Sequence, residues 1–167
     1  MDLDFRTFST RSFEQFSQAL SAHLLGPGIM IFGDGPDGGR EAAYDGTLDF
    51  PTSADAWNGY TIMQAKFLQV PKSPAEDAGW LVAQLEAEFE KFTTSESQLR
   101  KPKYYILVSN ARLSPLPSSS KRAGGIAKVD AVFKKYRERL GLADWRIWHL
   151  DQLTTYLASA DSIRRSY

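Results

Sequence analysis

Between residues 57 and 150, short apolar runs typical of buried strands alternate with longer amphipathic patterns typical of helices. The segments expected to form strands are Ile29–Phe32, Glu41–Leu48, Trp57–Val70, Tyr104–Val108 and Trp145–Leu150, and those expected to form helices are Ser12–Leu24, Ala75–Phe92, Ile126–Leu140 and Asp151–Ser159. Strands interleaved with helices form a sheet that is covered by helices on both faces. The first three strands can form a meander and the later ones join by crossovers, so we expect an α/β fold: a three-layer α/β/α sandwich with a mixed central sheet.

Composition narrows the function classes. A length of 167 residues suits a single domain spanning residues 1–167. The absence of Cys excludes disulfides, zinc ribbons and thiol nucleophiles, and two distant His residues argue against a histidine metal cluster. The chain contains no apolar run of membrane-spanning length and its first residues, MDLDFRTF, do not resemble a signal peptide. We therefore expect a cytoplasmic protein with no membrane partner.

The zero net charge is the sum of two unequal parts. Residues 1–99 carry 6 Lys and Arg against 15 Asp and Glu, whereas residues 100–167 carry 14 against 5. Such asymmetry indicates an anionic partner, or it averages out once the chain folds. The first interpretation predicts that part of the basic half lies beside the candidate site described next.

Chemistry-bearing residues concentrate in a glycine-rich turn, residues 33–39, and in the segment Gln64–Lys66. Residues two apart on a strand share a face, so Gln64 and Lys66 should project together. A buried Lys needs an anionic partner, and Asp37 and Glu41 are the candidates. Carboxylate and amide oxygens suit Mg²⁺, while a lysine beside them can orient water or stabilise charge on phosphorus. A P-loop is not indicated, because no Gly-Lys-Ser/Thr or helical pattern follows the glycines.

The motif pair FGDGPDGGREAAYDG and WNGYTIMQAKF resembles the PD-(D/E)XK nuclease superfamily, and more closely its Mrr-like restriction endonuclease branch. The whole chain also resembles the N-terminal nuclease-like effector domain of bacterial antiphage STAND-type NTPases. The resemblance implies a restriction-endonuclease-like fold and a chain that forms the N-terminal part of a larger protein. It also implies covalently linked NTPase or sensor regions and a homo-oligomeric active assembly.

The resemblance assigns roles to individual residues. The metal ligand at the end of the glycine-rich motif falls on Glu41, where the family usually has Asp, and Asp37 in the Pro-Asp pair is the alternative. Gln64 stands in the place of the acid of the D/E-x-K form and, with the Ala65 carbonyl, is a further candidate ligand. Lys66 matches the catalytic lysine. A Glu on the first helix near the metal corresponds to Glu14.

We therefore predict a Mg²⁺- or Mn²⁺-dependent endonuclease domain that hydrolyses phosphodiester bonds in DNA, with double-stranded DNA implied by the resemblance. Its catalytic set would be Glu14, Asp37, Glu41, Gln64 and Lys66. Phosphate contacts from the basic half are predicted at Lys121, Arg122, Lys128, Lys134 and Lys135.

Other interpretations stay open. A degraded module of the same fold could bind DNA or a partner protein without catalysis, since Glu41 and Gln64 both depart from the usual motif. A phosphatase or nucleotidase is a third possibility, although neither motif is visible. Asp37 could simply form a turn, Glu14 could favour the helix dipole, and Lys66 could pair structurally with Glu41. The basic residues could be solvated helix faces.

Overall fold

The computed structural model describes residues 4–26, 28–31, 40–94, 96–117 and 124–167. Its strands are β1 (Met30–Ile31), β2 (Ala42–Leu48), β3 (Trp57–Lys66), β4 (Tyr104–Ser109) and β5 (Asp144–Trp148). Its helices are α1 (Thr10–Leu25), α2 (Pro74–Thr93), α3 (Gly125–Leu140), α4 (Leu150–Leu157) and α5 (Asp161–Ser166), with a short 3-10 helix η1 (Phe5–Thr7) before them. The predicted strands and helices are confirmed to within a few residues, whereas η1 and α5 were not predicted. The glycine-rich turn lies outside the described residues.

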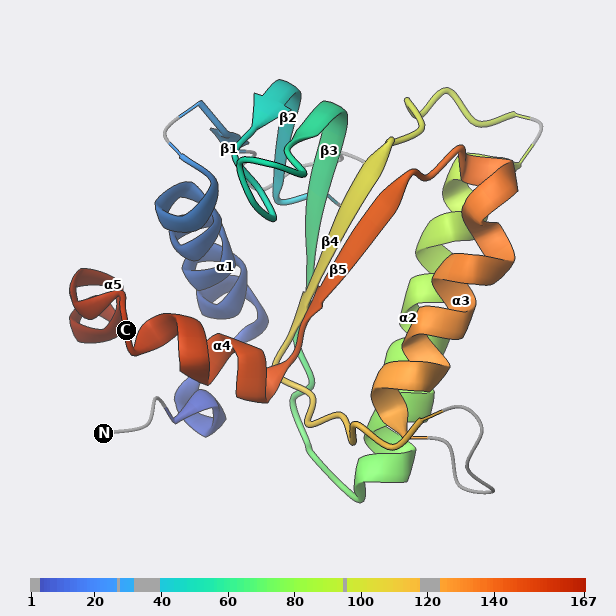
Figure 1. The fold of residues 1–167 in the computed structure, drawn as a ribbon. Helices are drawn as coiled ribbons and strands as arrows, with labels where there is room; N and C mark the ends of the chain where they lie inside the picture. The colour runs from blue at the N-terminus through green and yellow to red at the C-terminus, as the bar shows by residue number, and fades with distance from the viewer. Residues whose placement is uncertain (1–3, 27, 32–39, 95, 118–123) are drawn as a thin grey trace.

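The sheet is mixed, with the strand order β1-β2-β3-β4-β5. The first three strands pair antiparallel as a meander, and β3, β4 and β5 run parallel. Parallel neighbours need a crossover connection, which α2 supplies between β3 and β4 and α3 supplies between β4 and β5. Figure 1 shows α2 and α3 on one side of the sheet and α1 and α4 on the other, so the expected α/β/α sandwich is confirmed.

Each face of the sheet has its own core. The face covered by α2 and α3, here called the α2 face, buries alternate residues of β3 and β4 such as Ile62, Tyr105 and Leu107. The opposite face packs Met63 and other residues of β3 and β4 against α1, α4 and α5. The strict alternation follows from the two-residue period of a strand. It decides which side chains of β3 can reach α2.

Local sequence determines where helix α2, which covers the site, begins and which of its sides is buried. Its N-cap Ser73 accepts a hydrogen bond from the Glu76 backbone N–H, and the Glu76 side chain accepts one from the Ser73 N–H. This reciprocal capping box satisfies two donors at the helix start, and Pro74 occupies a first-turn position where its missing N–H costs nothing. From that start an apolar stripe runs along the buried side at helical spacing: Ala78, Leu81, Leu85, Phe89 and Phe92.

Among the described residues, no helix combines the length and apolar character needed to cross a membrane.

Candidate functional site

Gln64 and Lys66 project from β3 toward α2, as the strand period predicted. Gln64 pairs in register with Leu107 of β4, and its side chain is buried, with 1% of the residue exposed. Lys66 ends the strand, and 18% of its side chain is exposed. Ala65 between them belongs to the core of the opposite face. The strand therefore delivers an amide and an ammonium group to one place on the α2 face.

Glu41 lies beside this segment because the antiparallel pairing of β2 with β3 brings it there. Its backbone N–H donates to the Met63 carbonyl at 3.0 Å, one residue before the first described pair of the ladder. Its carboxylate oxygen Oε2 accepts a hydrogen bond of 2.7 Å from the backbone N–H of Ala65. The amide of Gln18 on α1 donates to the Glu41 carbonyl at 3.2 Å. The structure thus brings Glu41 to Gln64–Lys66, as predicted.

Glu88 of α2 is the direct partner of Lys66, and the sequence analysis did not identify it. Its Oε1 lies 2.6 Å from the Lys66 ammonium, and both of its oxygens lie 3.0 Å from the ammonium of Lys91. Only 6% of the Glu88 side chain is exposed. A signal was present: Glu88 follows Leu81 and Leu85 at the spacing of the buried stripe, where an acid requires a partner.

The pKa of Glu88 reflects two opposing causes. Burial raises it, but hydrogen bonds from Lys66, Lys91 and the Gln64 amide together outweigh burial, so the net pKa lies below its ordinary value. Glu88 is therefore ionised at neutral pH. Its charge fixes the position of the Lys66 ammonium.

Tyr105 of β4 orients Gln64. Its hydroxyl donates to the Gln64 side-chain carbonyl, which directs the Gln64 amide nitrogen toward Glu88. Complete burial raises the pKa of Tyr105 well above its ordinary value, and the negative charges of Glu88 and Glu41 raise it further. The hydroxyl therefore remains a donor. Glu88 binds Lys66 and Glu41 binds the Ala65 N–H, so a carboxylate lies on each side of this strand segment's polar groups.

Two predicted catalytic residues, Asp37 and Glu14, remain to be placed. Asp37 lies outside the described residues. Glu14 is half-buried on α1, one helical turn before Gln18, whose amide contacts the Glu41 carbonyl. This places Glu14 on the edge of α1 that adjoins the site, and its role near a metal stays a prediction.

The α3 lysines predicted to contact phosphate lie on the outward side of the helix layer. The ammonium of Lys135 is 3.5 Å from Glu86 of α2, and that of Lys134 is 2.9 Å from Asp130. Lys128 is exposed and, with Lys135, lines the outer groove between α2 and α3. These three lysines lie on the outer side of the helix layer, away from Lys66, so they are not the part of the basic half that would lie beside the site. Lys121 and Arg122 lie outside the described residues.

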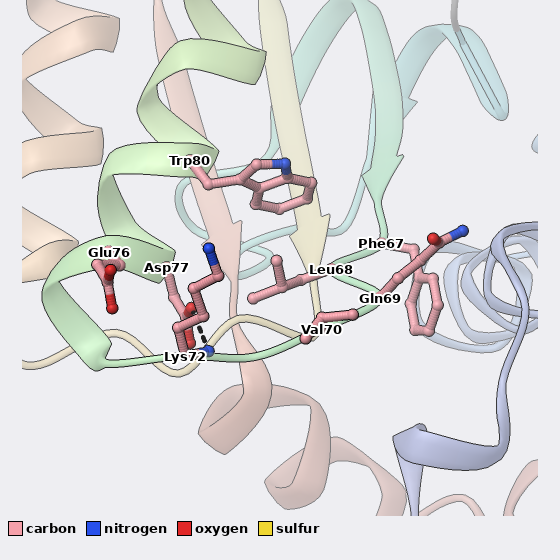
Figure 2. Close-up of a pocket in the computed structure, with 8 residues that line it drawn as sticks. All are labelled: Phe67, Leu68, Gln69, Val70, Lys72, Glu76, Asp77 and Trp80. Carbon is pink, nitrogen blue, oxygen red and sulfur yellow. Dashed lines mark hydrogen bonds between the residues drawn. The ribbon is translucent and has the colours of Figure 1, made fainter.

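A groove of about 390 Å³ opens next to the end of β3. It begins at Phe67, immediately after Lys66, and its other walls include Val70 and the first two turns of α2. Figure 2 shows the indole of Trp80 reaching from α2 toward Leu68, with the Asp77 carboxylate accepting from the Lys72 backbone N–H below it. The groove gives the end of β3 a solvent-accessible flank.

Comparison with known protein families, with curated proteins and with solved structures finds no match for this chain. The candidate site therefore depends on its own geometry and on the motifs in the sequence.

Proposed function

We propose that this chain is a divalent-metal-dependent endonuclease domain that hydrolyses phosphodiester bonds in DNA, with double-stranded DNA as the substrate. The observation that carries the proposal is the placement of Lys66. Its ammonium is held 2.6 Å from the buried carboxylate of Glu88, next to a strand segment whose N–H is bound by the carboxylate of Glu41. A lysine ammonium held in a fixed position can stabilise the negative charge that develops on a transferring phosphoryl group.

The donor set fits a hard cation such as Mg²⁺ or Mn²⁺. Within the described part of the chain, no group of three or more His, Cys, Asp or Glu side chains forms a ready metal site. The donors available are carboxylate oxygens of Glu41 and Glu88, the amide oxygen of Gln64 and the carbonyl oxygen of Ala65, which are all hard ligands. Because Gln64 already accepts a bond from Tyr105 and both Glu88 oxygens are bound by lysines, we assign the larger share of the binding to the Glu41 carboxylate. A bound cation would neutralise charge on the phosphate.

Lys66 is the residue that we expect to contact the reacting phosphate. An ammonium group carries three N–H donors, and the bond to Glu88 uses one of them. Another can hold a water or a phosphate oxygen, because 18% of the side chain reaches solvent. Glu88 holds the ammonium in place. Glu41 is positioned to accept a proton from water or to bind the cation.

The wider setting is also proposed from the sequence motifs. We propose that the domain is the effector of a bacterial antiviral defence protein that acts in the cytoplasm. In that setting, linked NTPase or sensor regions would bring several copies together. Two copies would then cut the two strands of a duplex.

The proposal is tested by cleavage of supercoiled plasmid in Mg²⁺ or Mn²⁺ by the wild type, Lys66→Ala and Glu41→Ala. Arg164→Ala is the matched control, because it removes a partly exposed cation on α5, on the opposite side of the sheet. We expect cleavage by the wild type and the control, and a loss of at least about 100-fold in the two site variants. Cleavage that is unchanged in both site variants would show that the site is misassigned.

A non-catalytic module of the same fold is the second candidate. The observation in its favour is that the Gln64 carbonyl accepts a bond from the buried Tyr105 hydroxyl, where a nuclease of this type usually has a second acid. This interpretation predicts DNA or partner binding that survives Lys66→Ala and Glu41→Ala, with no cleavage in either metal. Metal-dependent cleavage by the wild type that Lys66→Ala abolishes would eliminate it.

A further inference from the structure

A second cluster of polar groups lies on the α2 face, four residues before Gln64 along β3. Tyr60, Ile62, Gln64 and Lys66 alternate onto the same face of the strand, so Tyr60 is about 13 Å from Gln64 along its axis. An Nη of Arg40 donates to the Tyr60 hydroxyl. Because Arg40 directly precedes Glu41, its side chain connects the candidate catalytic site with the surroundings of Tyr60.

Arg100 joins the cluster from the loop before β4. Its guanidinium carbon lies 4.2 Å from the centroid of the Tyr60 ring, and its Nη2 lies 2.6 Å from Asp45 of β2. Tyr60 therefore positions two guanidinium groups, one at its hydroxyl and one over its ring. Arg100 is the first residue of the basic half of the chain. It reaches the face that carries the site, unlike the described lysines of α3.

The cluster is open to solvent over β2. The side chains of Arg100 and Asp45 are 60% and 53% exposed, and Thr47 and Asn58 beyond them are also exposed. An exposed ion pair such as Arg100–Asp45 contributes only about 0–1 kcal/mol. A phosphate can therefore replace Asp45 as the partner of Arg100 at little cost.

We propose that Arg40 and Arg100, held by Tyr60, bind backbone phosphates of the nucleic-acid strand whose scissile phosphate lies at Lys66. The inference rests on the proposed function, since it takes the substrate strand from Lys66 across the solvent-exposed side of β2 toward Arg100, and not across the β3 residues that α2 buries. Guanidinium groups suit this role because their fixed fork of donors matches phosphate oxygens, and ring stacking limits the freedom that binding would otherwise remove. Contacts of this kind hold the backbone without reading base sequence.

The test measures binding of a fluorescent DNA duplex by anisotropy over a series of salt concentrations, in the Lys66→Ala background and without metal. The variants are Arg100→Ala and Arg40→Gln. The matched control is Arg164→Ala, whose arginine also pairs with an exposed aspartate. A double variant, Lys134→Ala with Lys135→Ala, tests the outward face of α3. Thermal unfolding of each variant verifies that it is folded.

We expect Arg100→Ala and Arg40→Gln each to weaken binding about tenfold and to reduce the slope of log K against log salt by about 1, for one lost phosphate contact. The control should bind as the background does. Unchanged affinity and slope in both folded variants would overturn the inference, as would loss of binding confined to the α3 double variant or an absence of DNA binding by the background protein.

Cleavage assays separate this inference from the proposed function. If the wild type cleaves plasmid and the arginine variants cleave equally well at every salt concentration, the proposed substrate path is wrong. The proposed nuclease activity is then still supported. If the arginine variants lose DNA binding but the wild type never cleaves, the result supports the binding surface and contradicts the proposed nuclease activity.

Discussion

Substitution of Glu88 by Gln keeps the size of the side chain and removes the charge that anchors Lys66. Removing one partner of a buried ion pair costs about 3–5 kcal/mol, because the other charge is left without compensation. Here 18% of the Lys66 side chain and 52% of the Lys91 side chain are exposed, so both ammonium groups can recover some hydration. We therefore expect Glu88→Gln to lower the free energy of unfolding by about 2–3 kcal/mol at pH 7.

Urea unfolding followed by circular dichroism measures this loss. With a slope of about 2 kcal/mol per molar urea, the midpoint should fall by about 1–1.5 M with the slope unchanged. Glu86→Gln is the matched control on the same helix. Glu86 is 40% exposed and lies 3.5 Å from the ammonium of Lys135, so its loss should cost less than about 1 kcal/mol.

The pH dependence gives an independent check. The pKa of Glu88 is lowered in the folded state, so its stabilisation is fully present above the pKa of the unfolded chain and is lost as pH falls through the lower folded value. Once Glu88 is protonated, it carries the same zero charge as Gln. The difference between wild type and Glu88→Gln should therefore shrink in acid. A difference under 0.5 kcal/mol at pH 7, on the order of a surface substitution, would refute the reasoning.

Two further substitutions test the surroundings of the site and its helix layer by urea unfolding. Tyr105→Phe leaves the buried carbonyl of Gln64 without its hydroxyl donor, and we expect a loss of about 1–3 kcal/mol; a change below 0.5 kcal/mol would show that the bond contributes nothing. Gly124→Ala at the start of α3 would place a Cβ 2.3 Å from the backbone oxygen of Ser114, so we expect a loss of about 2–3 kcal/mol. Gly79→Ala is its control, because that Cβ meets no atom within 4 Å; equal stability of the two alanine variants would contradict the steric argument.

The arrangement of layers was predictable from the sequence because periodicity reports burial directly. The stripe Leu81, Leu85, Phe89 and Phe92 has the spacing of the buried side of a helix, and the short apolar run Tyr104–Val108 is typical of a buried central strand. The 3-10 turn at Phe5–Thr7 and helix α5 were not predicted, because each is too short to show a period. Their aromatic and apolar contacts come from other parts of the chain: Phe5 packs on Phe13 and Phe16 of α1.

The candidate site was only partly predictable. The proximity of Glu41 to Gln64–Lys66 follows from antiparallel pairing, which a strand pattern can suggest. The choice of Glu88 as the partner of Lys66 depends on how α2 packs over β3, which no local pattern encodes. The role of Tyr105 depends on the register between β3 and β4, and the sequence of β4 alone does not determine that register. The cluster of Arg40, Tyr60 and Arg100 was missed for the same reason, since these residues meet only through the sheet.

The bond from the Ala65 N–H to the Glu41 carboxylate has a consequence for the sheet itself. At this position a side-chain oxygen takes the place that a backbone carbonyl would occupy in a longer ladder, so the last rung between β2 and β3 is made by an ionisable group. A cation that draws this carboxylate away from Ala65 also opens that rung. The rate of hydrogen exchange at the Ala65 amide would therefore rise when a cation occupies the site. This one backbone amide of the sheet would report ligand binding.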